Sequence, residues 1–193
     1  MSGFLRALVL VLAWTQTARA HSPIVGVGGF YGGLLHPLLV PAHALSLLAL
    51  GLFIGRQESR RGPTIIFAAA LIAGLGAVAL AVGPTPAGEI LLADTAVVGA
   101  LVALAFVPPR PVGWLAAAVT GAALGLDSPP EEISIGLATI VLLGTGLGAC
   151  MALALVVGLT SYLRRDWQRL AVRIIGSWIA ASAMLVLAVR LTR

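Results

Sequence analysis

Residues 30–57 read FYGGLLHPLLVPAHALSLLALGLFIGRQ, and this stretch decides the fold of the chain. It joins a glycine-rich approach to a long apolar run that ends on Arg56. The stretch carries His36 and His43, and after residue 21 the chain has no other histidine. We therefore expect the remaining apolar segments to form a membrane-spanning scaffold arranged around these residues.

The composition of the chain is that of an integral membrane protein. Of its 193 residues, 60% are hydrophobic and 10% are charged, and the mean hydropathy is +1.06. Such a composition excludes a soluble globular domain. A chain of this length accommodates about six spans of roughly 20 residues each, with short connections. We expect an all-α integral membrane protein with about six transmembrane helices after a cleavable signal peptide.

The positive charge of the chain does not indicate a nucleic-acid partner. The net charge is +5, but every basic residue is an arginine, and the arginines lie in short clusters between apolar runs. Arginines in such places orient a chain in the bilayer. We expect the lipid bilayer, and no nucleic acid, as a partner. A single cysteine, Cys150, excludes an intramolecular disulfide and a CxxC-type metal or redox site.

Residues 1–20 have the form of a secretory signal peptide. A basic residue precedes an apolar core, and residues 18–20 read Ala-Arg-Ala, the small-x-small form of a cleavage site. Cleavage after this site would make His21 the first residue of the mature protein. The rest of the chain, residues 21–193, would then be a single transmembrane domain. The alternative is an uncleaved first helix.

Segments rich in proline divide the remaining chain into six apolar runs. We expect six transmembrane helices, over residues 34–55, 64–83, 89–107, 112–126, 134–161 and 170–189. The fourth is short, at about 15 residues, so it should be tilted little or thin the bilayer locally. Residues 21–33 hold five glycines, and we expect a surface or re-entrant segment there instead of a helix.

The connections between these runs alternate between basic and non-basic. Arginines follow the first, third and fifth runs, whereas the other connections carry the acids Glu89, Asp127, Glu131 and Glu132. The positive-inside rule therefore places the basic connections in the cytoplasm and His21 outside. Arg190 and Arg193 fall on the outer side, against this rule, so a re-entrant or five-span topology remains an alternative.

The prolines beside the two histidines predict a break in the first helix. A straight helix over residues 34–55 would place His43 about 10 Å deeper than His36. Imidazoles that far apart cannot both ligate one ion, because metal–nitrogen bonds are only about 2 Å long. They would instead be successive binding positions along a transport path. Pro37 and Pro41 each remove an amide donor, so we expect a kink or break between the histidines, as at transporter binding sites. The alternative is a pair of interfacial histidines beside prolines that only shape the helix start.

Three further residues are candidate metal ligands. At a mature N-terminus, His21 would offer an amine and an imidazole as a chelate. The alternative is that the mature chain simply happens to begin with a histidine that binds no metal. Asp94 is the one carboxylate well inside an apolar run, where an ionisable group is costly enough to indicate function. Glu89 opens the same expected helix. Stabilisation of the N-terminal turn of that helix is the alternative role for both acids.

The segment around the histidines resembles the HupE/UreJ family of small membrane proteins. The matching residues read GFYGGLLHP over 29–37 and HALSLLALGL over 43–52. The resemblance implies a metal permease of the bacterial inner membrane, associated with nickel supply to hydrogenases and ureases. The first helix of the family carries a histidine, five residues and then aspartate-histidine, and Ala42 stands here in place of that aspartate.

Two further family positions bear on which metal is bound. A histidine-rich motif of the family falls at residues 119–125, VTGAALG, where the glycines remain and the histidines are absent. Glu89 also occupies a family position. With fewer imidazoles and one carboxylate missing, the metal remains open among nickel, cobalt, copper and zinc.

The sequence thus favours a permease for a divalent transition-metal ion of the nickel type. The ion would be the substrate, and no prosthetic group is expected. The expected ligands are His21, His36, His43, Glu89 and Asp94. No catalytic triad or pair of catalytic carboxylates can be assembled, so we do not expect an enzyme. The alternative is a non-transporting accessory protein that assists assembly or anchoring of a metalloenzyme complex, with its glycine-rich faces serving association with that partner or in a homo-oligomer.

Overall fold

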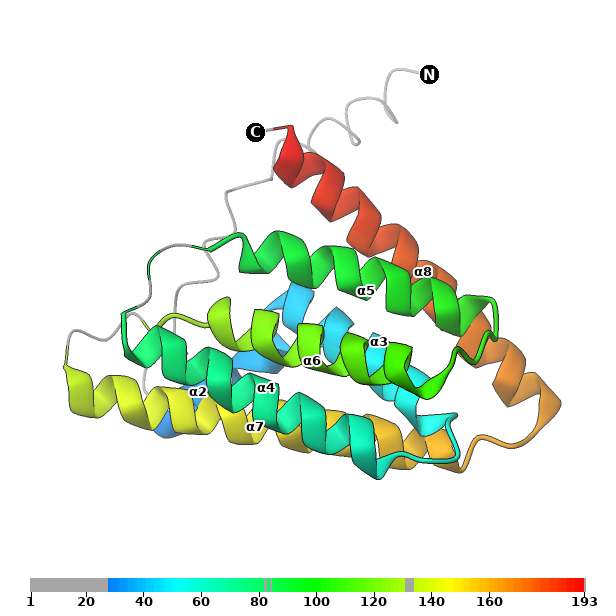
Figure 1. Cartoon of the computed structure of the whole chain (residues 1–193), viewed down its shortest axis with the longest axis horizontal. Helices are drawn as coiled ribbons and strands as arrows, with labels where there is room; N and C mark the ends of the chain where they lie inside the picture. The colour runs from blue at the N-terminus through cyan, green and yellow to red at the C-terminus, as the bar shows by residue number, and fades with distance from the viewer. Residues whose placement is uncertain (1–27, 82, 84, 131–133, 193) are drawn as a thin grey trace, which may run out of the picture.

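The computed structural model describes residues 28–81, 83, 85–130 and 134–192. Within these residues the chain forms seven α-helices and no strand (Figure 1). The helices are α2 Gly29–Leu39, α3 Pro41–Gly55, α4 Arg61–Ala79, α5 Ala87–Ala103, α6 Arg110–Leu126, α7 Ile135–Ser161 and α8 Asp166–Leu191. The expected signal peptide and His21 lie outside the described residues.

Helix α3 is the centre of the bundle. It packs against α2, α5, α6, α7 and α8, and most of its residues are buried. The other helices form three closely packed pairs around it: α4 with α6, α2 with α7 and α5 with α8. The expectation that the chain is organised around residues 30–57 is confirmed for α3, which lies wholly within this stretch and contacts five other helices.

The expected break in the first helix lies between α2 and α3. The two helices meet at an angle of 68°. Val40, between them, is extended, with φ −84° and ψ 112°, and Pro41 is the first residue of α3. Because Pro41 has no amide hydrogen, the hydrogen-bond ladder of α2 cannot continue through this position. Pro37, by contrast, is accommodated within α2.

Helix α2 begins earlier than expected. The glycine-rich residues before position 34 were expected to be irregular, but the helix begins at Gly29. The reason is the close contact between α2 and α7. A Cβ on Gly33 would meet the backbone carbonyl of Val141, and one on Gly148 would meet that of Leu34. The glycines therefore allow two helix backbones to touch, which is the role expected of small residues in membrane helices.

Helices α4 and α5 end earlier than the apolar runs that contain them. Ala81 and Ala105 follow these helices in the left-handed region, each with φ 55°. The amide of Ala105 donates to Val102 O, and that of Phe106 donates to Leu101 O, both at 3.1 Å. This is the Schellman pattern, which glycine usually terminates. Alanine takes the position here, so the sequence did not indicate where either helix stops.

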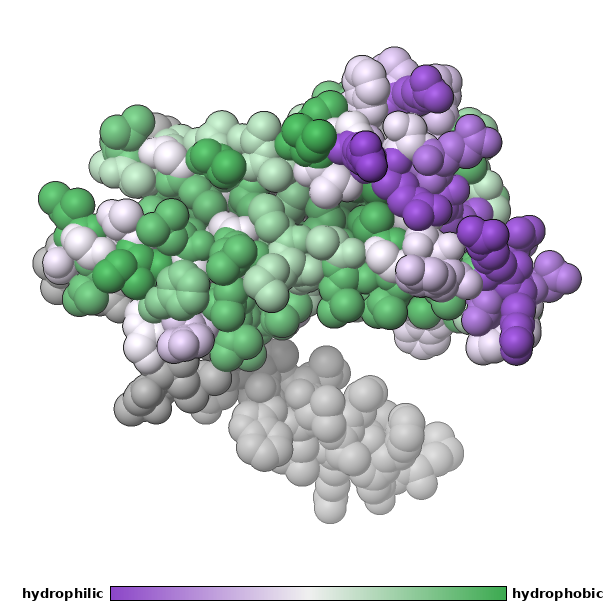
Figure 2. Space-filling model, turned by 90° about the horizontal axis from the view of Figure 1, so that it is seen from below, coloured by the Kyte–Doolittle hydropathy of each residue, from purple (hydrophilic) through white to green (hydrophobic). Residues whose placement is uncertain are grey.

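The apolar helices identify the chain as a membrane protein. By length and composition α4, α7 and α8 are each able to cross a membrane, and α2 with α3 would form a fourth, broken span. Helices α5 and α6 have 17 residues each, or about 25 Å. Apolar side chains cover much of the surface in Figure 2, whereas hydrophilic residues gather at one end. The arrangement of six crossings stays a prediction.

Candidate functional site

The break between α2 and α3 brings the two histidines together. His36 lies in the last turn of α2, and His43 lies in the first turn of α3. Their ring centroids are 5.4 Å apart, with the ring planes at 65°. The separation of about 10 Å that a straight helix would impose is therefore wrong for this chain. The rings lie closer than this because the bend at Val40 turns the start of α3 back toward α2.

His43 is the more enclosed of the two residues. Its side chain is completely buried, whereas that of His36 is partly exposed. The Nε2 atom of His43 lies 3.1 Å from Oδ2 of Asp127. When the imidazole is neutral, a proton on Nε2 is donated to this carboxylate, and the lone pair is then on Nδ1. Nδ1 is buried and has no hydrogen-bond partner among the described residues.

The partner of His43 comes from the C-terminal end of α6. Asp127 caps that helix, where the helix dipole disfavours a negative charge. An imidazole donor on the carboxylate offsets this unfavourable placement. Sequence reasoning treated Asp127 only as an acid in a connection and did not place it in the site. The available signal was a carboxylate at a helix C-terminus, on the side of the membrane expected for His36.

An ion pair between an arginine and a glutamate lies near Asp127. Arg190, near the end of α8, has its Nη1 4.0 Å from Oε1 of Glu89, in the first turn of α5. Arg190 and Asp127 both lie close to Gly88, because a Cβ there would meet Arg190 Nη1 and Asp127 Oδ1. Arg190 therefore lies near both Glu89 and Asp127, the hydrogen-bond partner of His43. The nearby acids Glu89 and Asp127 also explain why Arg190 lies at an end of the bundle where the positive-inside rule expects no arginine.

Asp94 lies apart from the histidines. It accepts a hydrogen bond of 2.5 Å from Thr120 Oγ1, across the contact between α5 and α6. Thr120 is itself buried. The alternative role of helix-dipole stabilisation fits Glu89, which is in the first turn of α5, better than Asp94, whose partner is a side chain of the next helix.

The site thus contains the imidazoles of His36 and His43 and the carboxylate of Asp127, which is hydrogen-bonded to Nε2 of His43. In the described part of the chain, no group of three or more histidine, cysteine, aspartate or glutamate side chains is arranged to hold a metal ion. The structure brings His36 and His43 together, pairs Glu89 with Arg190 near Asp127, and pairs Asp94 with Thr120 instead. Asp127 is the site residue that sequence reasoning missed.

The site lies at the end of the bundle opposite the arginines that follow α3, α5 and α7. Helix α3 runs from His43 in its first turn to Arg56 just after its last. Helix α6 runs in the other direction, from Arg110 to Asp127. Arg56 contacts the far end of α5, where its Nη1 donates to Val102 O at 3.0 Å. Three helices therefore separate the histidine site from the arginine end by most of their length.

Comparison with known families identifies the family of the chain. The family model described as HupE / UreJ protein matches residues 8–186, nearly the whole chain. This confirms the resemblance found around the two histidines. No match was found among curated proteins or among solved structures.

Proposed function

The chain belongs to the HupE/UreJ family, and on that premise we propose that it is a permease that carries a divalent transition-metal ion of the nickel type into the cell across the bacterial inner membrane. The family supports a metal-related permease or accessory role in the membrane. The observation that favours transport is the contact between His36 and His43, whose ring centroids are 5.4 Å apart at the break between two helices.

This distance suits a metal ion shared by the two rings. With metal–nitrogen bonds of about 2 Å, two imidazoles on one ion have ring centroids roughly 5–6 Å apart. The lone pair on His43 Nδ1 would supply one bond and His36 the other. Water and backbone carbonyls freed by the break would complete the coordination. A site with few protein ligands binds weakly enough to release the ion, which conduction requires.

Asp127 has two roles in this proposal. Its hydrogen bond to Nε2 fixes the tautomer of His43 and makes Nδ1 a better ligand, as carboxylates do behind many metal-bound histidines. Its negative charge also offsets that of a cation in a low-dielectric interior. The family places a carboxylate directly before the second histidine, and here Ala42 occupies that position. Asp127 supplies a carboxylate to the same imidazole from another helix.

The remaining candidate ligands belong to the path of the ion. His21 and Glu89 would capture the ion at the outer mouth, and Arg190 would release Glu89 for that purpose. Asp94 would neutralise the ion deeper in the bundle, after the histidine pair. The ion would then leave at the arginine end, on the cytoplasmic side.

The test is metal uptake by cells that carry the double variant His36→Ala, His43→Ala. We expect loss of nickel accumulation, with the variant present in the membrane at the normal level. The matched control is Ser46→Ala, which removes a buried hydroxyl from the same helix; that hydroxyl donates only to His43 O, at 2.8 Å. Unchanged uptake of nickel, cobalt, copper and zinc by the double variant would rule out the permease.

One observation favours the accessory role instead. The described residues hold no group of three or more metal-ligating side chains. An accessory protein that anchors a metalloenzyme complex needs no such group. It would co-purify with a stable partner and contain no metal, whereas a permease purified with its substrate would contain metal that depends on His36 and His43.

A further inference from the structure

A pocket lies at the end of the bundle opposite the histidines. Its volume is about 280 Å³, and its walls include four arginines and two hydroxyl residues: Arg56, Arg60, Thr160, Ser161, Arg164 and Arg169. They come from the connection between α3 and α4, from the end of α7 and the connection after it, and from the first turn of α8. The pocket therefore lies where parts of the chain that are far apart in sequence meet.

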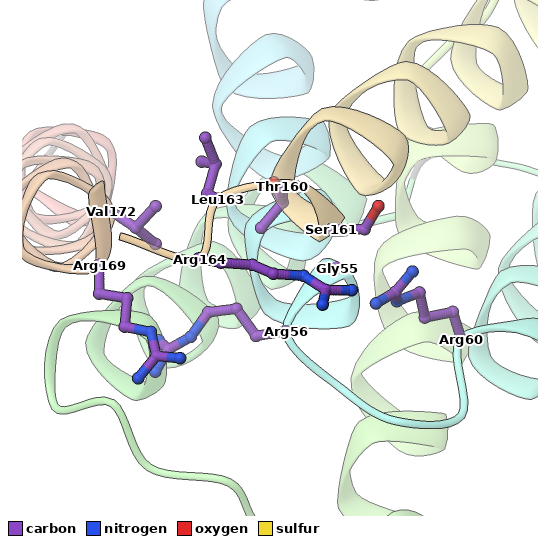
Figure 3. A pocket seen from close by; sticks show the side chains of 9 residues that line it. All are labelled: Gly55, Arg56, Arg60, Thr160, Ser161, Leu163, Arg164, Arg169 and Val172. Carbon is purple, nitrogen blue, oxygen red and sulfur yellow. The ribbon is translucent and has the colours of Figure 1, made fainter. Parts of the chain in front are cut away.

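The guanidinium groups in this pocket lie in two pairs. Figure 3 shows Arg164 extending toward Arg60 past the end of α3, and Arg169 beside Arg56. Arg56 donates to Val102 O, and Arg60 donates to Gln57 O. The side chains of Arg164 and Arg169 form no hydrogen bond with any described residue. Four like charges are thus gathered around one cavity.

No acid balances these charges in the part of the chain that the structure describes. Glu58 lies in the connection between α3 and α4, and Asp166 begins α8, but neither forms an ion pair with an arginine of the pocket. Burial lowers the pKa of Arg56, and repulsion from Arg173 and Arg169 lowers it further. The pocket therefore destabilises its own cations when it is empty of anions, and a bound anion would relieve both effects.

The arrangement suits a phosphate group. A guanidinium presents parallel N–H donors that match phosphate oxygens, and several such groups approaching from different sides suit a tetrahedral anion better than a planar carboxylate. The volume is at the small end for ligand pockets, so it accommodates a phosphate or a small phosphate ester. Basic pockets between helices at the cytoplasmic end of membrane proteins bind lipid phosphates in this way.

We propose that Arg56, Arg60, Arg164 and Arg169 form a binding site for a phosphate-bearing anion. The anion would join the α3–α4 connection to the α7–α8 connection and would hold this end of the bundle together. The ligand is either the headgroup of an anionic phospholipid or a soluble phosphate. The site lies at the opposite end of the bundle from the residues proposed to capture the metal ion, and the proposal stands whether or not the chain is a permease.

The test uses the purified full chain in neutral detergent. We expect sodium phosphate to raise the midpoint of thermal unfolding by at least about 2 °C over sodium chloride at equal ionic strength. In lipid nanodiscs, phosphatidylglycerol is expected to stabilise the chain over phosphatidylcholine. Stabilisation by the lipid alone identifies a headgroup site, and stabilisation by both identifies a general phosphate site. If neither phosphate nor phosphatidylglycerol stabilises the wild-type chain, the proposal is wrong.

Variants assign the effect to the pocket. Arg164→Gln with Arg169→Gln removes two guanidinium groups whose side chains bond to no described residue, so the fold should persist. We expect this variant to bind phosphate at least about tenfold more weakly. The matched control, Arg61→Gln with Arg110→Gln, removes the same charge from exposed arginines that begin α4 and α6, outside the pocket. Equal loss in both variants would show nonspecific attraction and would overturn the proposal.

Discussion

The imidazole of His43 and the carboxylate of Asp127 join the start of α3 to the end of α6, with Nε2 and Oδ2 3.1 Å apart. The two residues are 84 positions apart in the sequence. Their contact fixes the orientation of a ring that is otherwise surrounded by the bundle. It also determines which nitrogen of His43 is left to face a ligand.

This contact predicts the effect of Asp127→Asn. Asparagine keeps the shape of the side chain and an acceptor oxygen, but it removes the charge that makes His43 a better ligand. We expect the affinity of the purified protein for nickel to fall by about 10- to 100-fold, as for other carboxylates behind metal-bound histidines. Calorimetric titration measures this. Ser128→Ala, which removes the neighbouring buried hydroxyl, is the control, and equal affinity in both variants would contradict the role of Asp127.

The break before α3 predicts a loss of binding in Pro41→Ala. Alanine restores an amide donor, so the hydrogen-bond ladder of α2 can continue into α3. The rings would then move toward the separation of about 10 Å of a straight helix. We expect lower metal content in the purified variant, without loss of helix in circular dichroism. Pro111→Ala, at an exposed position in the first turn of α6, should retain its metal. A fully loaded Pro41→Ala protein would show that the break is not needed.

The contact between α2 and α7 predicts that Gly148→Ala is destabilising. The added methyl group would meet the carbonyl of Leu34 and force the two helices apart. We expect a loss of about 1–3 kcal/mol in the free energy of unfolding. Gly158 lies in the same helix with nothing within 4 Å of its Cβ position. Gly158→Ala should therefore be neutral or stabilising, by up to about 1 kcal/mol. Similar unfolding curves for the two variants would contradict the proposed packing.

The separate position of Asp94 predicts a change in transport without a change in stability. Asp94→Asn removes the charge but keeps an oxygen that accepts from Thr120. We expect nickel uptake to slow several-fold, because the ion loses a counter-charge inside the bundle, while the unfolding midpoint stays the same. Thr120→Val is the comparison, since it breaks the hydrogen bond and should cost about 1–3 kcal/mol of stability. Normal uptake by Asp94→Asn would leave Asp94 with a structural role only.

Much of the fold follows from local sequence signals. Apolar runs predicted helices, and Pro41 predicted the break, because a missing amide donor acts on the residues immediately before it. The helix stops at Ala79 and Ala103 were not predictable, since alanine takes the left-handed position that glycine usually marks. The start at Gly29 depends on the contact with α7, which no local pattern encodes.

The site was predictable in part for the same reason. His36 and His43 stand out because histidines are rare in this chain and both lie beside the break. Their contact depends on the angle of the break, which proline alone does not set. Asp127 reaches His43 only through the packing of α6 against α3. Contacts between helices that are distant in sequence are a property of the tertiary structure. The sequence therefore placed Asp127 in a connection between helices but did not predict its contact with His43.

The most direct test of the central claim is nickel binding to the purified full chain, measured for the wild type and for His36→Ala with His43→Ala. The account predicts that the wild type binds nickel, with X-ray absorption showing imidazole nitrogens around the ion. It predicts that the double variant binds at least about 100-fold more weakly, which is about 2.7 kcal/mol. Equal binding by both proteins, or a nickel spectrum without imidazole, would contradict it.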